Sequence, residues 1–232
     1  VQDEAGGLWH VSLPGMQTKK LVSFHAGAIT GLGVSALSHH AITCGADATV
    51  RLFDYRTRRQ LYSREFNAPA TTLTMLPMHV NSAGRTVIVG YADGVVRALL
   101  RCADEYKLTA VFKPHKEAVT QIAFSPDGKT LATASSDKSV FFFLVDGFKP
   151  IGFVTVPGAA SCIAWNDDSS ALLVGSVKGD ILELQCPPSD IDTSKTFEII
   201  VGTKFYDFKK PKPVKEAAAV TEGTEAETEA PK

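Results

Sequence analysis

Short apolar runs alternate with polar turns along most of this chain. Between residues 119 and 156 the runs VTQIAFS, TLATAS, VFFFLV and IGFVTV are separated by turns such as SPDGK and SSDKS. Runs of this length, bounded by Asp, Gly and Ser, are typical of β-strands joined by tight turns. No segment before residue 205 has a convincing helical periodicity. The pattern predicts an all-β protein with a strand about every 10 residues.

The same order of strands and turns recurs in two 32-residue segments that align without a gap. In one segment His25 stands 22 positions before Asp47, and in the other His115 stands 22 positions before Asp137. A fixed spacing between the same residue types indicates an internal repeat rather than two unrelated motifs.

Two weaker copies complete the series. Asp93 occupies the position of Asp47 in a copy with a longer loop, and Lys178 takes that position in the last copy. The steps between the four equivalent positions are 46, 44 and 41 residues. A four-stranded propeller blade takes about 40 to 45 residues, so the period favours a β-propeller over a β-sandwich.

The chain begins in mid-blade, because the opening stretch DEAGGLWHVSLP reads as a third strand with its preceding turn. Closed propellers usually have more than four blades, so we expect the C-terminal part of a larger propeller. The expected order is the end of a partial blade at 1–23, blades at 24–66, 67–113 and 114–156, a blade with a closing strand near Thr196–Val201 at 157–202, and a disordered tail or linker at 203–232.

The repeat resembles the WD40 family over roughly residues 20–188. Its hallmarks are a Gly-His-like pair before the first strand, an Asp in the turn before the third strand, and a Trp-Asp pair that closes the third strand. Here Phe53-Asp54 stands for Trp-Asp, and Phe143 takes the Trp position in another copy. The resemblance implies a buried hydrogen-bond network in the blades, without the indole donor. Its members would be His25, Thr43, Asp47, Phe53, Asp93, His115, Thr133, Asp137 and Phe143.

A Thr close to a His and an Asp also invites interpretation as a catalytic triad. The trio recurs from repeat to repeat, which favours a structural role in which a buried Asp accepts hydrogen bonds from turn amides and from the His. The sequence contains no phosphate-binding loop, zinc-protease motif or nucleophile elbow. We therefore expect no catalytic, cofactor-binding or metal-binding residues, and no enzymatic activity.

Composition excludes several other classes of protein. The formal net charge is −1 and the pI is about 6.6, so no overall field attracts nucleic acid or anionic lipid. No apolar run approaches the roughly 18 to 20 residues that span a bilayer, and no leader peptide precedes the repeats. We expect a soluble, intracellular fragment of a longer protein.

The four cysteines lie 58, 60 and 24 residues apart, which fits neither a zinc site nor a redox dithiol. Cys44 and Cys162 stand in apolar runs, where a thiol behaves as a small hydrophobic group. Inert, buried thiols are the prediction.

The run SVFFFLV is predicted to be a third strand that is buried on both faces. Because successive side chains of a strand point to opposite faces, Phe142 should face away from Phe141 and Phe143.

The C-terminal residues differ in composition. From Lys209 onward there are no aromatic residues and many Glu, Lys and Pro, which predicts disorder. Residues 204–215 interleave aromatics with lysines. That segment could bind nucleic acid or an acidic surface such as a microtubule, or it could be a solvated exit from the last blade; nucleic acid is not favoured by the overall charge.

Longer strings, from about Phe24 to Ile199, resemble the second propeller of a family of ciliary and flagellar WD40 proteins. The strings include FKPHKEAVTQIAFSPDGKTLATASSDKSVFFF and LELQCPPSDIDTSKTFEI. The resemblance implies an axonemal scaffold that helps to tether an inner-arm dynein to the doublet microtubule. Its implied partners are other axonemal WD40 subunits, a dynein heavy chain and tubulin, with no cofactor, small-molecule substrate or membrane. The alternative is a generic cytosolic WD40 adaptor, such as a substrate receptor of a ubiquitin ligase.

Overall fold

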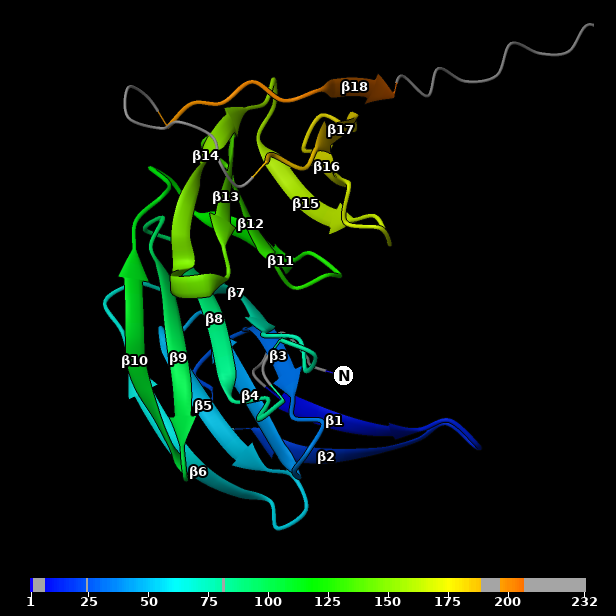
Figure 1. Ribbon diagram of the computed structural model, residues 1–232. Helices are drawn as coiled ribbons and strands as arrows, with labels where there is room; N and C mark the ends of the chain where they lie inside the picture. Colours follow the sequence, from blue (N-terminus) through cyan, green and yellow to red (C-terminus); the bar gives the residue numbers. More distant parts are fainter. Residues whose placement is uncertain (2–6, 24, 81, 189–196, 207–232) are drawn as a thin grey trace, which may run out of the picture.

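The computed structural model describes residues 1, 7–23, 25–80, 82–188 and 197–206. In these residues the regular structure is β-strand, with one short 3-10 turn at Asp146–Phe148. The strands form four four-stranded antiparallel sheets and one two-stranded sheet, which follow one another along the chain (Figure 1). The all-β prediction is confirmed. Within the described part of the chain, no helix is long and apolar enough to cross a membrane.

Each sheet is a meander in which strands pair in chain order. The two-stranded sheet contains β1 (Gly7–Ser12) and β2 (Gln17–Ser23). Sheet 1 contains β3 (Ile29–Val34), β4 (His40–Gly45), β5 (Thr49–Asp54) and β6 (Arg59–Glu65). Sheet 2 contains β7 (Ala70–Met75), β8 (Thr86–Tyr91), β9 (Val96–Cys102) and β10 (Glu105–Phe112). Sheet 3 contains β11 (Val119–Phe124), β12 (Thr130–Ser135), β13 (Ser139–Leu144) and β14 (Lys149–Thr155). Sheet 4 contains β15 (Ala160–Trp165), β16 (Ala171–Ser176), β17 (Ile181–Gln185) and β18 (Thr203–Tyr206).

The core lies between consecutive sheets. Separate clusters of buried apolar side chains join sheet 1 to sheet 2, sheet 2 to sheet 3, and sheet 3 to sheet 4. All six residues of β8 and all six of β12 are buried. A strand with a neighbouring sheet on each face is covered on both faces, which explains why neither of these strands contains a charged residue.

The phenylalanine run of β13 contributes side chains to both interfaces of sheet 3, one with sheet 2 and one with sheet 4. Phe142 is wholly buried in the cluster between sheets 3 and 4, where its ring lies edge-on to Trp165 at 6.1 Å. Phe143 is buried in the cluster between sheets 2 and 3, with its ring 4.8 Å from that of Phe112, and Phe141 packs against the same cluster. The prediction that Phe142 faces opposite to its two neighbours is confirmed.

The fourth strand of sheet 4 lies further along the chain than expected. β18 pairs with β17, whereas the segment around Glu198 forms a parallel bridge with Phe153 of sheet 3. The backbone amide of Phe153 donates to the carbonyl of Phe197 at 2.7 Å, and the amide of Ile199 donates to the carbonyl of Phe153 at 2.8 Å.

The predicted closing strand at Thr196–Val201, and a tail starting at residue 203, are therefore wrong. Ile199 is 7% exposed and fills the cluster between sheets 3 and 4, so burial of this apolar side chain directs the segment to sheet 3. Thr196 and the remainder of the expected tail, residues 207–232, lie outside the described residues.

The cysteines are not uniformly buried. Burial raises the pKa of the Cys44 thiol to about 12, as expected for an inert thiol. Cys162 is exposed, so the prediction of a buried thiol is wrong at this position. The equivalent residue in sheet 1 is Gly31, whose Cα faces Leu73 of sheet 2 so closely that an added Cβ would lie 2.6 Å from the Leu73 Cβ. Cys162 therefore stands on the side of sheet 4 that faces away from sheet 3.

Candidate functional site

His25 joins the loop before sheet 1 to the turn between β4 and β5. Its Nδ1 lies 2.9 Å from Oδ1 of Asp47, and its Nε2 lies 2.7 Å from Oγ1 of Thr43. Asp47 also accepts hydrogen bonds from the backbone amides of Ala26 at 3.0 Å and Thr49 at 3.1 Å. The structure thus brings the three sequence-predicted residues of this copy together around one buried imidazole.

Sheet 3 repeats this arrangement, with Ser139 in the place of Thr49, whose hydroxyl in sheet 1 lies 3.2 Å from His25 Nδ1 and donates to Asp47 at 2.8 Å. His115 Nε2 lies 2.9 Å from Oγ1 of Thr133, and Nδ1 lies 2.9 Å from Oγ of Ser139 and 3.4 Å from Oδ2 of Asp137. The Ser139 hydroxyl donates to Asp137 at 2.5 Å, and the backbone amide of Lys116 donates to the same carboxylate at 2.8 Å. Ser139 thus bridges the ring and the carboxylate.

The charge states in these networks follow from burial and hydrogen bonding. Burial alone would raise the pKa of Asp47 and of Asp137, but the hydrogen bonds that each carboxylate accepts outweigh it, and both pKa values lie below the ordinary 3.8. Burial lowers the pKa of His115 below 6.5, and the nearby Asp137 offsets only part of that effect. At neutral pH, sheet 3 therefore holds a carboxylate beside a neutral imidazole.

Burial also limits what this trio can do chemically. Thr133 on one ring nitrogen and Asp137 near the other have the order of a hydrolase triad. However, Thr133 is 0% exposed and His115 is 2% exposed, so a substrate cannot reach the hydroxyl while the strand is folded. We propose that both networks fasten the loop before the first strand to the turn between the second and third strands.

In sheet 2, different contacts connect the loop before the first strand to the turn between the second and third strands. Phe66 stands at the position of His25, and Asp93 accepts a hydrogen bond from the backbone amide of Val95 at 3.1 Å. The Arg97 guanidinium carbon lies 4.2 Å from the ring centroid of Tyr91 and 5.1 Å from that of Phe66. Cation–π contacts thus stand where sheets 1 and 3 have the hydrogen bonds of a histidine. Sequence reasoning missed this cluster, although aligning the repeats places Phe66 at the His position.

The remaining site positions lie in the buried core or in a turn. Phe53 and Phe143, which stand where the family has Trp, are 1% and 3% exposed. In sheet 4 the turn contains the exposed Lys178, and the Ser176 hydroxyl there accepts the backbone amides of Lys178 and Asp180 at 3.2 Å each. The turn that has Lys178 in place of the repeat's Asp is therefore closed by a serine.

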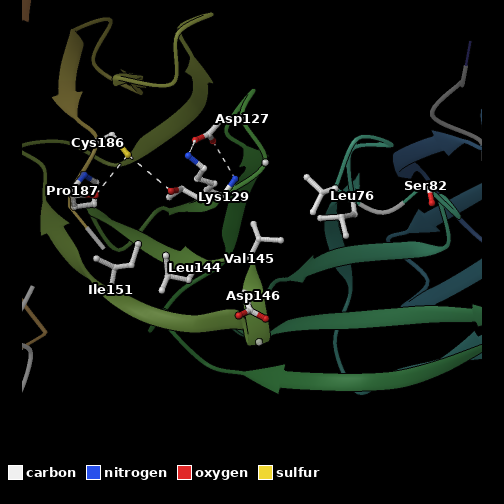
Figure 2. Close-up of a pocket in the computed structure, with 14 residues that line it drawn as sticks. Leu76, Ser82, Asp127, Lys129, Leu144, Val145, Asp146, Ile151, Cys186 and Pro187 are labelled. Atoms are coloured by element: carbon white, nitrogen blue, oxygen red, sulfur yellow. Dashed lines mark hydrogen bonds and ion pairs between the residues drawn. The ribbon is translucent and has the colours of Figure 1, made fainter. Parts of the chain in front are cut away.

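A crevice of about 860 Å³ opens among the turns of sheets 2, 3 and 4. Figure 2 shows Leu76 on one side, Cys186 and Ile151 on the other side, and Leu144 and Val145 between them. Its rim carries Asp127, Lys129 and Asp146, and Lys129 Nζ lies 3.6 Å from Oδ2 of Asp127. Its lining residues are Leu76, Val80, Ser82, Asp127, Gly128, Lys129, Thr130, Leu144, Val145, Asp146, Gly147, Ile151, Cys186 and Pro187.

The chemistry of this crevice suits a protein side chain better than a reaction. Burial raises the pKa of the Cys186 thiol, which disfavours the thiolate that nucleophilic catalysis needs. Among the described residues, no group of three or more His, Cys, Asp or Glu could hold a metal ion. An apolar floor with a charged rim is the usual composition of a peptide-contact surface.

A second, aromatic pocket of about 400 Å³ lies between the outer strands of sheets 2 and 3. Phe112, Phe141, Phe148 and Phe153 line it, and the rings of Phe141 and Phe153 stack at 4.8 Å. Phe197, from the segment bound to β14, is 47% exposed at the same pocket.

Comparison with known families agrees with the repeat seen in the sequence. The WD40 family, described as "WD domain, G-beta repeat", matches residues 16–54 and 106–143. These two stretches include sheet 1 up to β5, and sheet 3 up to β13.

Two named relatives are similar over a longer part of the chain. "Cilia- and flagella-associated protein 44" of Mus musculus is 34% identical over 88% of this chain, and its namesake from Chlamydomonas reinhardtii is 32% identical over 92%. The chain spans 12% and 14% of the length of these two proteins. "Echinoderm microtubule-associated protein-like 2" of Mus musculus is 30% identical over 70% of this chain, which spans 25% of that protein.

A solved structure is similar in fold. The crystal structure of Sqt1 from Saccharomyces cerevisiae superimposes with a TM-score of 0.71 at 12% identity, covering 82% of this chain and 55% of Sqt1. Similarity at this level of identity concerns the fold only. Together with the serial four-stranded sheets and the matched repeats, it identifies the chain as a WD40-repeat protein with a β-propeller fold.

Proposed function

We propose that this chain is part of a non-catalytic scaffold that binds other proteins in the axoneme of the motile cilium or flagellum. The observation that carries the proposal is the similarity to cilia- and flagella-associated protein 44, which covers 88% to 92% of the chain. That similarity extends beyond the two stretches that match the general WD40 repeat, so it is more specific than the fold.

The geometry supports binding rather than catalysis. The polar trios that could do chemistry are buried, whereas the open surfaces are a crevice with an apolar floor and an aromatic pocket. Rigid blades that present loops from several sheets at one place are well suited to hold partner proteins. The crevice among sheets 2, 3 and 4 is of this kind.

In its finer form, the proposal is that the parent protein helps to tether or regulate an inner-arm dynein on the doublet microtubule. The partners would be other axonemal WD40 subunits, a dynein heavy chain and tubulin. The resemblance to ciliary scaffolds supports the dynein partner, and the similarity to a microtubule-associated protein supports the microtubule.

Localisation and cross-linking in a ciliated cell test the proposal. A tagged copy of the full-length protein should lie along the axoneme and stay there after detergent extraction. Cross-linking followed by mass spectrometry should recover dynein heavy chain and tubulin peptides. Uniform cytosolic signal, with recovery of ubiquitin-ligase subunits, would instead favour the cytosolic adaptor.

A pair of charge reversals tests whether the crevice is a contact surface. Asp146→Lys changes an exposed residue at the crevice rim, so it should weaken recovery of a cross-linked partner severalfold without unfolding the protein. Asp180→Lys changes an exposed residue in the β16–β17 turn, which is at the opposite end of the strands, and should leave recovery unchanged. Equal behaviour of the two variants would contradict a role for the crevice.

A further inference from the structure

One position in the third strand holds an arginine in sheets 1 and 2 and a phenylalanine in sheet 3. Arg51 and Arg97 stand at this position, and Phe141 of β13 is the equivalent residue. Arg51 Nη2 donates to Oδ2 of Asp47 at 3.2 Å, and Arg97 stacks on an aromatic ring of its own sheet. The ring of Phe141 instead lies edge-on to that of His115, with the centroids 5.1 Å apart. In sheet 3 an aromatic ring therefore takes the place of a guanidinium group.

The residue that pairs with Phe141 on the fourth strand also differs from its equivalents. It is Phe153, whose ring stacks on that of Phe141 at 4.8 Å. The equivalent residues are Ser63 in sheet 1 and Val111 in sheet 2. The stacked pair therefore belongs to sheet 3 and is not a requirement of the repeat that sheets 1 and 2 share.

These two rings help to form the aromatic pocket between the outer strands of sheets 2 and 3. Of the described residues that line its volume of about 400 Å³, six are phenylalanines, two are prolines and one is Lys113. The volume lies within the range of roughly 300 to 1,000 Å³ that is typical of ligand-binding pockets. Phe197 is 47% exposed at this pocket. Exposed aromatic side chains around an open apolar pocket are characteristic of interaction sites.

The space between the outer strands of sheets 3 and 4 shows what such a pocket accommodates. Ile199, which is 7% exposed, completes the buried cluster there. Its segment is held by hydrogen bonds to the backbone amide and carbonyl of Phe153. An extended segment that inserts an apolar side chain therefore fits between two outer strands. In the described part of the chain, the pocket between sheets 2 and 3 stays open.

Lys113 determines which charge a bound group can carry. It is exposed, and within the described residues it forms no ion pair. The faces of aromatic rings attract cations, but a lysine at the same pocket repels them. A carboxylate next to an apolar side chain is complementary to both the lysine and the rings.

We propose that this aromatic pocket binds a short acidic segment of a partner protein. The segment inserts an aromatic side chain among the phenylalanines and places a carboxylate near Lys113. An aromatic anchor is favoured over an aliphatic one because ring–ring contacts add to the burial of apolar surface. The chain's own end fits less well, because from Lys209 onward it has carboxylates but no aromatic residue. The inference concerns a surface other than the crevice and does not depend on where in the cell the protein acts.

Calorimetric titration of the full-length protein with three synthetic peptides tests this inference. The first peptide is acetyl-Glu-Glu-Phe-Glu-Glu-amide, the second has Ala in place of Phe, and the third has Lys in place of each Glu. The first should bind about tenfold more tightly than either of the others. Equal binding of the Ala peptide would indicate a general charge effect, and equal binding of the Lys peptide would indicate a cation-binding pocket; either result would overturn the proposal. Absence of binding would also overturn it, including the case in which another part of the same protein fills the pocket.

A pair of charge reversals locates the contact with the carboxylates. Lys113→Glu should weaken binding of the acidic peptide about tenfold and strengthen binding of the Lys peptide, because it reverses the charge at the pocket. Lys138→Glu is the matched control: Lys138 is exposed in the β12–β13 turn and is not among the residues that line the pocket, so both affinities should stay unchanged. If the two variants behave alike, the peptide does not bind at this pocket.

A pair of phenylalanine variants locates the aromatic anchor. Phe197→Ala removes an exposed ring from the pocket and should weaken binding of the acidic peptide severalfold. Phe205→Ala removes a ring that is 64% exposed in β18 and should leave binding unchanged. Since all four substituted residues are exposed, circular dichroism should show unchanged melting for each variant. Equal affinities of the two phenylalanine variants would contradict the proposed anchor site.

Discussion

His115 lies within hydrogen-bonding distance of two hydroxyl groups and 3.4 Å from a carboxylate, yet it is 2% exposed. Such a group stabilises a fold because each of its partners would be costly to leave unpaired in a buried site. His25 does the same in sheet 1 through Thr43 and Asp47. At this scale, residue type and spacing determine which side chains are in contact. Burial determines that these contacts stabilise the fold and do not act on a substrate.

Removing the ring should therefore cost stability. His115→Ala leaves the buried Thr133 hydroxyl without its partner and removes the imidazole beside Asp137, and we expect a loss of roughly 1 to 3 kcal/mol in the free energy of unfolding. Asp137→Ala should lose a similar amount. Urea titration followed by circular dichroism measures both, and His10→Ala, at an exposed position in β1, should stay within about 0.5 kcal/mol of the unmodified protein. Unchanged midpoints for both core variants would contradict the structural role.

Acidification should weaken the fold in two stages. The folded pKa of His115 is lowered, so the unfolded chain binds a proton below about pH 6.5 while the folded chain does not; stability falls as the pH drops through that range. Asp47 and Asp137 also have lowered folded pKa values, so their contribution is present above about pH 3.8 and is lost below it. The free energy of unfolding, measured from pH 7.5 to 3, should show both stages. His115→Gln should reduce the first stage, and Asp47→Asn should reduce only the second.

At the scale of elements, the segment just before β18 pairs with sheet 3, although it lies in the chain between β17 and β18 of sheet 4. Phe197 and Ile199 bond to the edge of β14 in sheet 3 before the chain continues into β18 of sheet 4. Gly152 makes this approach possible: an added Cβ would lie 2.6 Å from Cγ2 of Ile199 and 2.7 Å from the carbonyl oxygen of Phe197. Its φ of 152° is also unfavourable for residues with a side chain.

Gly152→Ala should accordingly release this segment from β14. We expect faster hydrogen exchange at the amides of Phe153 and Ile199, together with a loss of about 1 to 3 kcal/mol, while exchange in sheets 1 and 2 stays unchanged. Gly147→Ala is the control. Gly147 also has a positive φ, of 69°, but an added Cβ would meet nothing closer than 3.7 Å. If the two variants exchange alike, steric contact with the segment is not the cause.

At the scale of the whole molecule, each sheet is stabilised by packing on the sheets that precede and follow it in the chain. The buried clusters join sheets 1 and 2, 2 and 3, and 3 and 4, and each sheet therefore depends on the sheets beside it. A defect at one interface should remain concentrated there.

Phe142→Ala tests this serial dependence. The side chain is 0% exposed between sheets 3 and 4, so the cavity should cost about 3 to 5 kcal/mol. Hydrogen exchange should speed up most in sheets 3 and 4 and least in sheet 1. Phe205→Ala, at a residue that is 64% exposed, should change stability by about 0.5 kcal/mol or less. A uniform loss of protection across all sheets would show one cooperative unit instead.

The sequence alone determined the strand order, the repeat and the His–Asp spacing, because alternation along a strand and turn chemistry are local properties. It also placed Phe142 opposite to Phe141 and Phe143, since that depends only on the period of a strand. Four features were decided by the tertiary structure: the binding of Ile199 to sheet 3, the exposure of Cys162, the stacking of Arg97 on Tyr91, and the crevice among three sheets. Each of these features depends on contacts between residues that are distant in the chain. The packing of one sheet on the next determines which of those residues come into contact.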